Sequence, residues 1–361
     1  MAVALFDTSS PLAPLRNELR DAIDRVLDAE RYILGPEVEA FEHELAAYCG
    51  AAHAVGVANG TEAITIALRA MGVGPGDEVV VPSFTFYASV EAISPTGARP
   101  AFCDIDPSTY CVTADTVRAA ITPRTKAVIA VHLFGNVAPV AEIEALGVPV
   151  LEDAAQAVGS DSAAGRPGSL GMAATFSFYP SKNLGCFGDG GMIVTSDEQI
   201  AERARILRFH GSRDKVDYEQ IGYNSRLDEL QAAILRVQLP ELERWAAHRN
   251  GVGEWYAQAG LGELVALQGV PEGTRPAWHV YVVRHERADD LVAALGAAGI
   301  GSRAYYRTPI HRQPAMAGLG GAELPATEEL ARTHLALPVS AAMRRDQVDE
   351  VVAAVRDADL G

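Results

Sequence analysis

Lys182 is the first residue in this chain whose surroundings suggest covalent chemistry. It follows the aromatic run TFSFY (175–179) after a Pro-Ser pair, and a glycine-rich stretch, 185–191, comes after it. An amine at the apolar mouth of a sheet loses hydration, so its pKa falls and more of it is the neutral nucleophile that attacks carbonyl carbon. A surface lysine in a loop fits the same pattern.

Two other stretches place polar groups where a ligand could bind. Asp153 ends the apolar run VPVLED, with Gln156 one helical turn later, and a carboxylate there could hold a ribose, a metal or a protonated heterocyclic nitrogen. Gly60 and Thr61 precede a helical pattern, where a capping Thr61 hydroxyl and free N–H groups would form an anion site. The plain alternative for both stretches is an ordinary helix cap.

The elements that must position these residues alternate along the first two-thirds of the chain. β-Branched or aromatic runs predict strands, and helical patterns such as 113–121 and 139–146 separate them. This alternation is typical of a mostly parallel sheet covered by helices on both faces, in which ligands bind beyond the carboxyl ends of the strands. The predicted strands are 78–83, 99–105, 126–133, 148–153, 175–179 and 191–196.

A smaller unit follows a long helical stretch over 226–258 that Pro240 interrupts. We expect a large domain over 1–248, N-terminal segment included, and a small α+β domain over 249–361. The elements predicted for the small domain are strands at 278–284 and 301–307 and helices at 288–299 and 344–358.

Composition excludes several classes of function. The 361 residues are 48% hydrophobic and carry a net charge of -17, an ordinary globular balance that argues against nucleic acid or an anionic membrane as partner. The four cysteines form no CxxC pair, which predicts reduced thiols in a cytoplasmic protein and no metal site. There is no GxxxxGK[ST] phosphate loop, no GxGxxG after a first strand, no signal-peptide pattern and no apolar stretch fit to span a membrane.

In their order along the chain, the motifs resemble the DegT/DnrJ/StrS family of pyridoxal-phosphate (PLP) sugar aminotransferases. They are NGT before a helix, ED-x-x-Q after a strand, FSF-x-x-x-K before a glycine-rich turn, and GYNSRLDELQAA (222–233). The likeness extends from ILGPEVEAFE (33–42) to ELPATEELA (323–331). It implies an α/β fold-type-I aminotransferase. Such an enzyme has a mainly parallel seven-stranded sheet in the large domain, a smaller α+β C-terminal domain, and two active sites shared across a homodimer.

The resemblance also implies roles for single residues. Lys182 matches the lysine that forms a Schiff base with PLP and carries the proton between cofactor and substrate carbons. Asp153 matches the carboxylate that keeps the pyridine nitrogen protonated. Histidine at the lysine position would imply a sugar dehydratase, so Lys182 favours transamination. The other matched cofactor contacts are Gln156 near the ring hydroxyl, Gly60, Thr61 and Ser177 at the phosphate, Phe86 stacked on the ring, and Asn224 from the neighbouring subunit.

The substrates expected from the resemblance are L-glutamate as amino donor and a nucleotide-linked keto-sugar as acceptor. We expect a TDP- or UDP-linked 4-keto-6-deoxyhexose, aminated at C-4 in amino-deoxysugar and antibiotic biosynthesis. Amination at C-3 of a 3-keto isomer and aminotransfer to a keto-cyclitol are alternatives. The alternative without enzymatic activity is a catalytically inactive regulatory homologue, and the intact Lys182, Asp153 and Gln156 argue against it.

Candidates for the substrate side come from two stretches. Residues 203–215 carry a net charge of +4 and place His210 and Arg213 beside a turn, where a nucleotide diphosphate could bind. In the second stretch the candidates are Tyr305 with the adjacent Tyr306, then His311 and Arg312 of PIHRQPA. A solvated helix face and packing of the small domain are the competing explanations.

Overall fold

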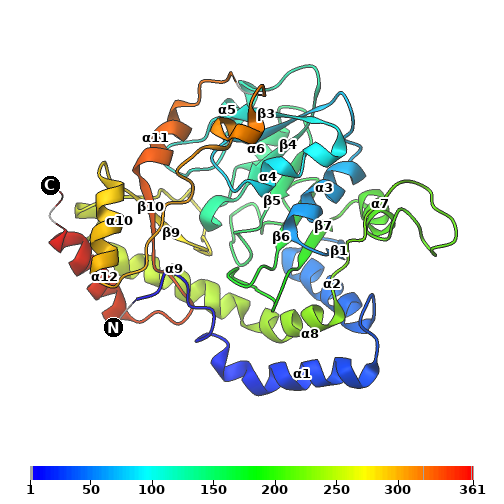
Figure 1. Ribbon diagram of the computed structural model, residues 1–361, viewed down its shortest axis with the longest axis horizontal. Helices are drawn as coiled ribbons and strands as arrows, with labels where there is room; N and C mark the ends of the chain where they lie inside the picture. The colour runs from blue at the N-terminus through cyan, green and yellow to red at the C-terminus, as the bar shows by residue number, and fades with distance from the viewer. Residues whose placement is uncertain (1–2, 320, 359, 361) are drawn as a thin grey trace.

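A seven-stranded sheet forms the centre of the larger part of the molecule (Figure 1). The computed structural model describes residues 3–319, 321–358 and 360. The strand order is β1-β7-β6-β5-β4-β2-β3, parallel from β6 to β3, with β7 antiparallel to both β1 and β6. This is the mainly parallel α/β sheet that the sequence predicts. The strands are β1 (His53–Val57), β2 (Glu78–Pro82), β3 (Arg99–Cys103), β4 (Thr125–Val131), β5 (Val150–Asp153), β6 (Ala173–Ser177) and β7 (Gly191–Thr195).

Helices cover both faces of the sheet. One face packs on α3 (Gly60–Ala70), whereas α2 (Pro36–Cys49) and α8 (Glu229–Gln238) share an apolar cluster on the other. The side chains of β7 alternate accordingly, with Ile193 in the α3 cluster and Met192 in the α2–α8 cluster. The remaining helices are α1 (Arg16–Ala29), which lies along α8 (Figure 1), α4 (Ala88–Glu91), α5 (Ala114–Arg118), α6 (Val140–Glu144) and α7 (Glu198–Arg208).

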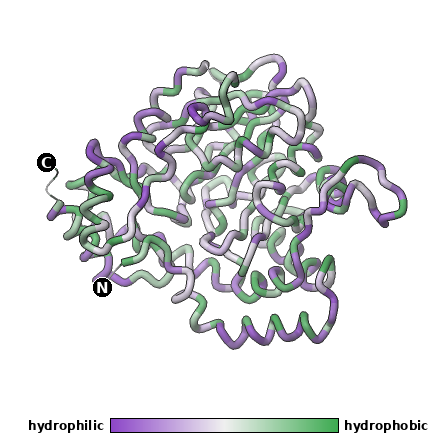
Figure 2. The backbone as a smooth tube through the Cα atoms, in the orientation of Figure 1, coloured by the Kyte–Doolittle hydropathy of each residue, from purple (hydrophilic) through white to green (hydrophobic). Residues whose placement is uncertain are grey.

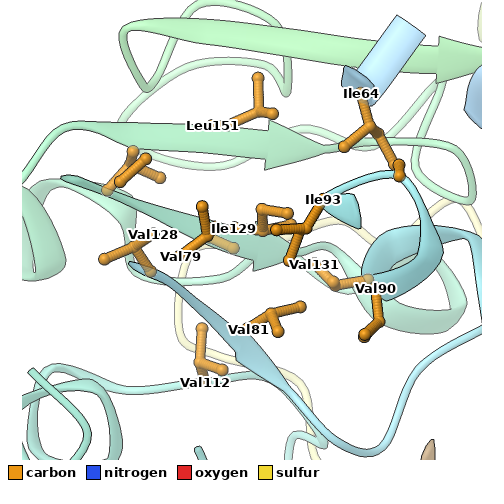
Figure 3. Close-up of a cluster of buried hydrophobic side chains, with 14 of the residues drawn as sticks. Ile64, Val79, Val81, Val90, Ile93, Val112, Val128, Ile129, Val131 and Leu151 are labelled. Atoms are coloured by element: carbon orange, nitrogen blue, oxygen red, sulfur yellow. The ribbon is translucent and has the colours of Figure 1, made fainter. Parts of the chain in front are cut away.

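Branched aliphatic side chains fill the space between the parallel strands and α3 (Figure 3). Val79, Ile129, Leu151 and Ile64 come from four different elements, and each is at most 2% exposed. Each such side chain contributes about 1.5–3 kcal/mol when fully buried. Figure 2 shows the hydrophobic segments in the interior and hydrophilic residues along α1. This core holds the carboxyl ends of the strands in fixed positions.

All six predicted strands of the large sheet are present, with ends shifted by no more than two residues. The sequence analysis missed β1, whose five residues, HAVGV, include Gly56. Glycine weakens a strand pattern, but here it leaves room for Leu227, whose Cβ would lie 3.0 Å from a Cβ on Gly56.

The C-terminal part contains a second, antiparallel sheet in the order β10-β9-β8. The predicted strand at 301–307 is wrong: Arg303 makes a single bridge to Ala336, after which Tyr305 and Tyr306 turn toward other aromatic rings. The predicted strand at 278–284 begins later, and both predicted helices are present. The elements are β8 (Ala266–Leu267), β9 (Tyr281–Arg284), β10 (His334–Leu337), α10 (Ala288–Ala297), α11 (Pro325–Thr333) and α12 (Arg345–Asp357).

A long helix connects the two sheets. The chain leaves α8 through a short 3-10 turn, Leu239–Glu241, that contains Pro240, and continues as α9 (Leu242–Gln258). The proposed domain boundary between residues 248 and 249 falls inside α9. At the other end of the chain, Val3 pairs with Ile300, so the N-terminal segment also contacts the C-terminal part.

Neither a membrane-spanning helix nor a metal-binding cluster is present among the residues that the structure describes. None of their helices has the length and apolar character needed to cross a membrane. Their His, Cys, Asp and Glu side chains form no cluster of three or more that could hold a metal ion. All four cysteines are buried free thiols, and burial raises the pKa of Cys111 to about 12, so that thiol stays neutral.

Candidate active site

The start of α3 and the end of β6 lie against each other at one edge of the sheet. A Cβ built on Gly60 would be only 2.7 Å from the Cβ of Ser177, so the close approach requires glycine at position 60. Gly191 has a similar role, because a Cβ there would be 2.4 Å from the carbonyl carbon of Asn59. Two glycines therefore bring the helix start to the Ser177 hydroxyl.

Asn59, and not Thr61, caps α3. The Asn59 side chain accepts a hydrogen bond from the N–H of Glu62 at 2.9 Å, which corrects the prediction of a Thr61 cap. Within the part of the chain that the structure describes, the N–H groups of Gly60 and Thr61 have no hydrogen-bond partner. Free N–H groups at the positive end of the helix dipole favour an anion such as phosphate.

Asp153 ends β5 with a nearly buried carboxylate. Its Oδ2 accepts a hydrogen bond from the Ser89 hydroxyl at 2.6 Å, and its Oδ1 accepts one from the N–H of Ala155 at 3.2 Å. The adjacent Glu152 points to the opposite face of the strand, as alternation requires, and there it accepts a hydrogen bond from His132. Of these two carboxylates, Asp153 is therefore the one that is available to the site.

Gln156 lies between the sheet and the C-terminal part. Its Oε1 accepts a hydrogen bond from the N–H of Phe134 at 2.7 Å, and its Nε2 donates to the Tyr306 hydroxyl at 3.3 Å. The ring of Tyr306 is 5.9 Å from that of Phe86, centroid to centroid. Burial raises the pKa of Tyr306, so its phenol stays protonated.

Phe86 is 55% exposed although its ring is large and apolar. It belongs to the segment between β2 and α4, and Ser89 follows three residues later, inside α4. An exposed ring beside Tyr306 provides an apolar surface that a planar ligand would cover.

Lys182 is partly buried in the loop after β6. Burial lowers the pKa of Lys182 to about 8, while the Asp153 carboxylate acts in the opposite direction. Burial also lowers the pKa of the nearby His279 well below its ordinary value, so this histidine stays neutral beside the amine. The fraction of neutral amine near pH 7 is therefore larger than for an ordinary lysine.

Asn224 is exposed, and its amide oxygen accepts a hydrogen bond from Arg226. The next residue, Ser225, accepts one from the N–H of Ala58 at 3.1 Å, close in sequence to the cap of α3. Within one chain, Asn224 therefore lies on the surface near the anion site. Its contact with the cofactor phosphate of the neighbouring subunit stays a prediction.

The basic segment after α7 is less free than its charge suggests. Arg213, on the loop that protrudes beyond α7 (Figure 1), forms ion pairs with Glu202 of α7 and with Glu219 of the same loop. His210 is exposed, has a φ of 65° and donates its N–H to the carbonyl of Tyr223 at 2.8 Å. The two side chains lie on one exposed loop, as the sequence predicts, with Arg213 already paired.

His311 is buried between the two parts of the chain. Its Nδ1 lies 2.6 Å from the Ser83 hydroxyl and its Nε2 lies 2.9 Å from Glu328, which also binds Arg312. His311 and Arg312 form hydrogen bonds and ion pairs with other described residues. None of these contacts involves Lys182, Asp153 or Gln156. These contacts favour the packing explanation for His311 and Arg312.

Tyr305 and its neighbours lie closer to the cofactor residues. Its ring contacts Phe6 and lies under the Arg303 guanidinium, 5.3 Å from the ring centroid. Arg303 has no carboxylate within ion-pair distance in the described part of the chain. Sequence reasoning did not single out Arg303, Ser89 or Asn59. Of these three residues, only Asn59 could have been found from the sequence, because it belongs to the NGT motif and asparagine is a strong N-cap residue.

The arrangement fits PLP. The free N–H groups of Gly60 and Thr61 and the Ser177 hydroxyl suit its phosphate, and the Asp153 carboxylate suits a protonated ring nitrogen. An amine with a lowered pKa suits its aldehyde.

Comparison with known proteins agrees with this assignment. Residues 14–356 match the DegT/DnrJ/EryC1/StrS aminotransferase family. The chain is 46% identical to dTDP-3-amino-3,4,6-trideoxy-alpha-D-glucose transaminase of Streptomyces venezuelae, over 98% of this chain and 96% of the relative. It is 43% identical to a pleiotropic regulatory protein of Geobacillus stearothermophilus, over 98% and 97% of the two chains.

A solved structure has the same fold throughout. The crystal structure of S. venezuelae DesV in complex with a ketimine intermediate matches with a TM-score of 0.96 at 45% identity, and the match covers 100% of this chain and 99% of that one. The chain therefore belongs to the DegT/DnrJ/EryC1/StrS aminotransferase family, and it is a pyridoxal-phosphate-dependent transaminase.

Proposed function

We propose that the protein transfers the amino group of L-glutamate to a nucleotide-linked keto-6-deoxyhexose. The observation that carries this proposal is the set of cofactor residues at one edge of the sheet, with Lys182 beside Asp153. The name of the S. venezuelae relative, a dTDP-aminosugar transaminase, supports a nucleotide sugar as the acceptor.

Each residue of the cluster has a distinct task in this proposal. PLP, when bound, supplies an electron sink that stabilises a carbanion. Lys182 Nζ would hold PLP through its aldehyde carbon, and the same amine would carry a proton between the cofactor carbon and the substrate carbon. Asp153 holds the positive charge on the ring nitrogen, and Gln156 with Tyr306 holds the ring edge on the side of the C-terminal part.

The other cofactor contacts bind and shield. The N–H groups of Gly60 and Thr61 and the hydroxyl of Ser177 bind the phosphate, and Phe86 covers the ring and excludes water. Asn224 adds a contact to the phosphate of the neighbouring subunit in a homodimer with two shared sites. Exposed apolar side chains on the loop after α7, among them Ile221 at 86% exposure, supply a surface for that second copy.

The position of amination has two candidates of equal standing. The overall likeness of the sequence to its family favours C-4 of a 4-keto sugar, whereas the relative from S. venezuelae carries a 3-amino group in its name. A keto-cyclitol acceptor is the third candidate. For the acceptor side we propose Tyr305 with Tyr306 at the sugar and His210 and Arg213 at the diphosphate. The cysteine pattern, which predicts reduced thiols, supports a cytoplasmic location for the reaction.

One assay separates these candidates. Purified protein with PLP and L-glutamate is offered a TDP-4-keto-6-deoxyhexose, its 3-keto isomer or a keto-inositol, and 2-oxoglutarate and the aminated product are measured by mass spectrometry. NMR of the product assigns the carbon that bears nitrogen. Aminated nucleotide sugar from the wild type and none from Lys182→Ala supports the proposal. Amination of the keto-inositol alone contradicts it.

A regulatory protein without catalysis is the second candidate, because one relative is named a pleiotropic regulatory protein. Turnover of any of the three acceptors would count against it as the sole function.

A further inference from the structure

A chain of buried hydroxyl groups leads to the Asp153 carboxylate. The Ser89 hydroxyl is 2.6 Å from Asp153 Oδ2, and Thr85 Oγ1 is 3.0 Å from Ser89 Oγ. Ser89 and Thr85 are 1% and 2% exposed, so water does not replace these contacts. The sequence analysis assigned a role to neither residue.

Donor and acceptor follow from the charge of Asp153. An ionised carboxylate can only accept, so the single Ser89 proton points to Oδ2. The Ser89 oxygen is then free to accept the proton of Thr85. With the N–H of Ala155 on Oδ1, each carboxylate oxygen receives one donor and keeps a lone pair for a further partner. The ordered chain therefore fits the charged form of Asp153.

We propose that Ser89 is a positioning residue: its hydrogen bond to Oδ2 aims the Asp153 carboxylate at the ring nitrogen of PLP, and Thr85 orients Ser89. This proposal rests on the assignment of Asp153 to the ring nitrogen. Hydrogen bonds to an ionised group are shorter and stronger than neutral ones, which is why a single serine can fix this orientation.

The same short segment also positions the ring. Thr85 and Ser89 flank Phe86, the exposed aromatic proposed to stack on the cofactor. One turn of chain after β2 therefore sets the ring surface and the carboxylate together. The charged and titratable groups that interact with Asp153 from other elements are Lys182, in the loop after β6, and Tyr306, in the C-terminal part.

The test follows the cofactor itself in the intact holoenzyme. We expect Ser89→Ala to weaken PLP binding about tenfold, the size of effect that a hydrogen bond to a charged group supports. Without the Ser89 donor, the negative charge of Asp153 loses one of the hydrogen bonds that stabilise it. The acid midpoint for release of the cofactor, followed by visible absorbance, therefore rises by about one pH unit. The ¹⁵N NMR signal of ring-labelled PLP then reports loss of the ring proton at the same midpoint.

Matched variants separate positioning from packing. Thr85→Val should raise the acid midpoint for cofactor release by less than Ser89→Ala does. Ser89→Thr keeps the hydroxyl, so its acid midpoint should equal that of the wild type. Thr96→Val removes a buried hydroxyl that binds the carbonyl of Ile93 instead, so it should lower the Tm and leave the midpoint in place. A Ser89→Ala protein with a lower Tm and an unchanged midpoint and ¹⁵N signal overturns the proposal.

Asp153→Asn distinguishes the two assignments. If it leaves the ¹⁵N signal unchanged, the assignment of Asp153 fails and the role of Ser89 fails with it. If it moves the signal while Ser89→Ala does not, only the role of Ser89 is overturned. Neither result depends on which sugar the enzyme aminates.

Discussion

Gly60 and Ser177 approach so closely that a methyl group on Gly60 would lie 2.7 Å from the Ser177 Cβ and 3.2 Å from its Oγ. The contact joins backbone to a strand end, so neither side can move away cheaply. Gly60→Ala should therefore open the proposed phosphate site and raise the dissociation constant for PLP by about tenfold or more, because charge-assisted hydrogen bonds are lost. Equilibrium dialysis against the apo-protein measures it.

Gly296→Ala is the matched control for this variant. Gly296 lies in α10, and nothing lies within 4 Å of a Cβ built there. Alanine is favoured over glycine inside a helix by about 1 kcal/mol, so the Tm should rise while PLP affinity stays the same. Equal PLP affinity in Gly60→Ala and the wild type would contradict the placement of the phosphate site at the start of α3.

Capture of PLP by Lys182 should depend on pH with a midpoint near 8. Only the neutral amine attacks an aldehyde, and burial lowers the pKa of Lys182 to about 8. The capture rate should rise about tenfold per pH unit below that value and level off above it. Stopped-flow absorbance of apo-protein mixed with PLP measures the profile, and a midpoint near the ordinary value for lysine would contradict the buried environment.

The Asp153→Asn variant tests the direction in which the Asp153 carboxylate shifts the pKa of Lys182. The Asp153 carboxylate raises the pKa of Lys182 against the effect of burial, so removing its charge should move the midpoint of capture below 8. A midpoint shifted upward would show that the two groups do not interact as the structure places them.

The sequence predicted the positions of Asp153 and Lys182 relative to strand ends because both depend on local patterns. A buried apolar run has to end where its polar residues begin, and the sheet fixes which edge that is. The cap of α3 was misassigned to Thr61 because spacing alone cannot tell which of two neighbouring polar residues starts a helix. The extended φ of Asn59, -165°, decides it.

Long-range partners explain most of what the sequence could not give. His311 meets Ser83, which is 228 positions away, and Ser89 meets Asp153 across 64 positions. No local periodicity encodes such pairs, since the fold alone brings them together. The free charge of the basic stretch was overestimated for a nearer reason: Glu202 and Glu219 lie just outside residues 203–215 and pair with Arg213.

Arg213→Ala should raise the KM for the nucleotide sugar severalfold and leave the half-reaction with L-glutamate unchanged. Exposed ion pairs contribute only about 0–1 kcal/mol, so a diphosphate with two or more negative charges can displace Glu202 and Glu219 from the guanidinium. Single-turnover kinetics of each half-reaction test this. Equal effects on both half-reactions would assign Arg213 to the stability of its own loop.

His311→Ala should act on stability and not on substrate. The imidazole bridges Ser83 and Glu328, and His311 also donates its own N–H to the Ser83 hydroxyl at 3.1 Å. Truncation leaves a buried Ser83 hydroxyl without the ring, which costs about 1–3 kcal/mol, so the free energy of unfolding in urea should fall by that amount. The KM for the nucleotide sugar should stay within twofold of the wild-type value. A rise in KM at unchanged stability would instead place His311 at the sugar, and Arg312, which shares Glu328, would be the next residue to test.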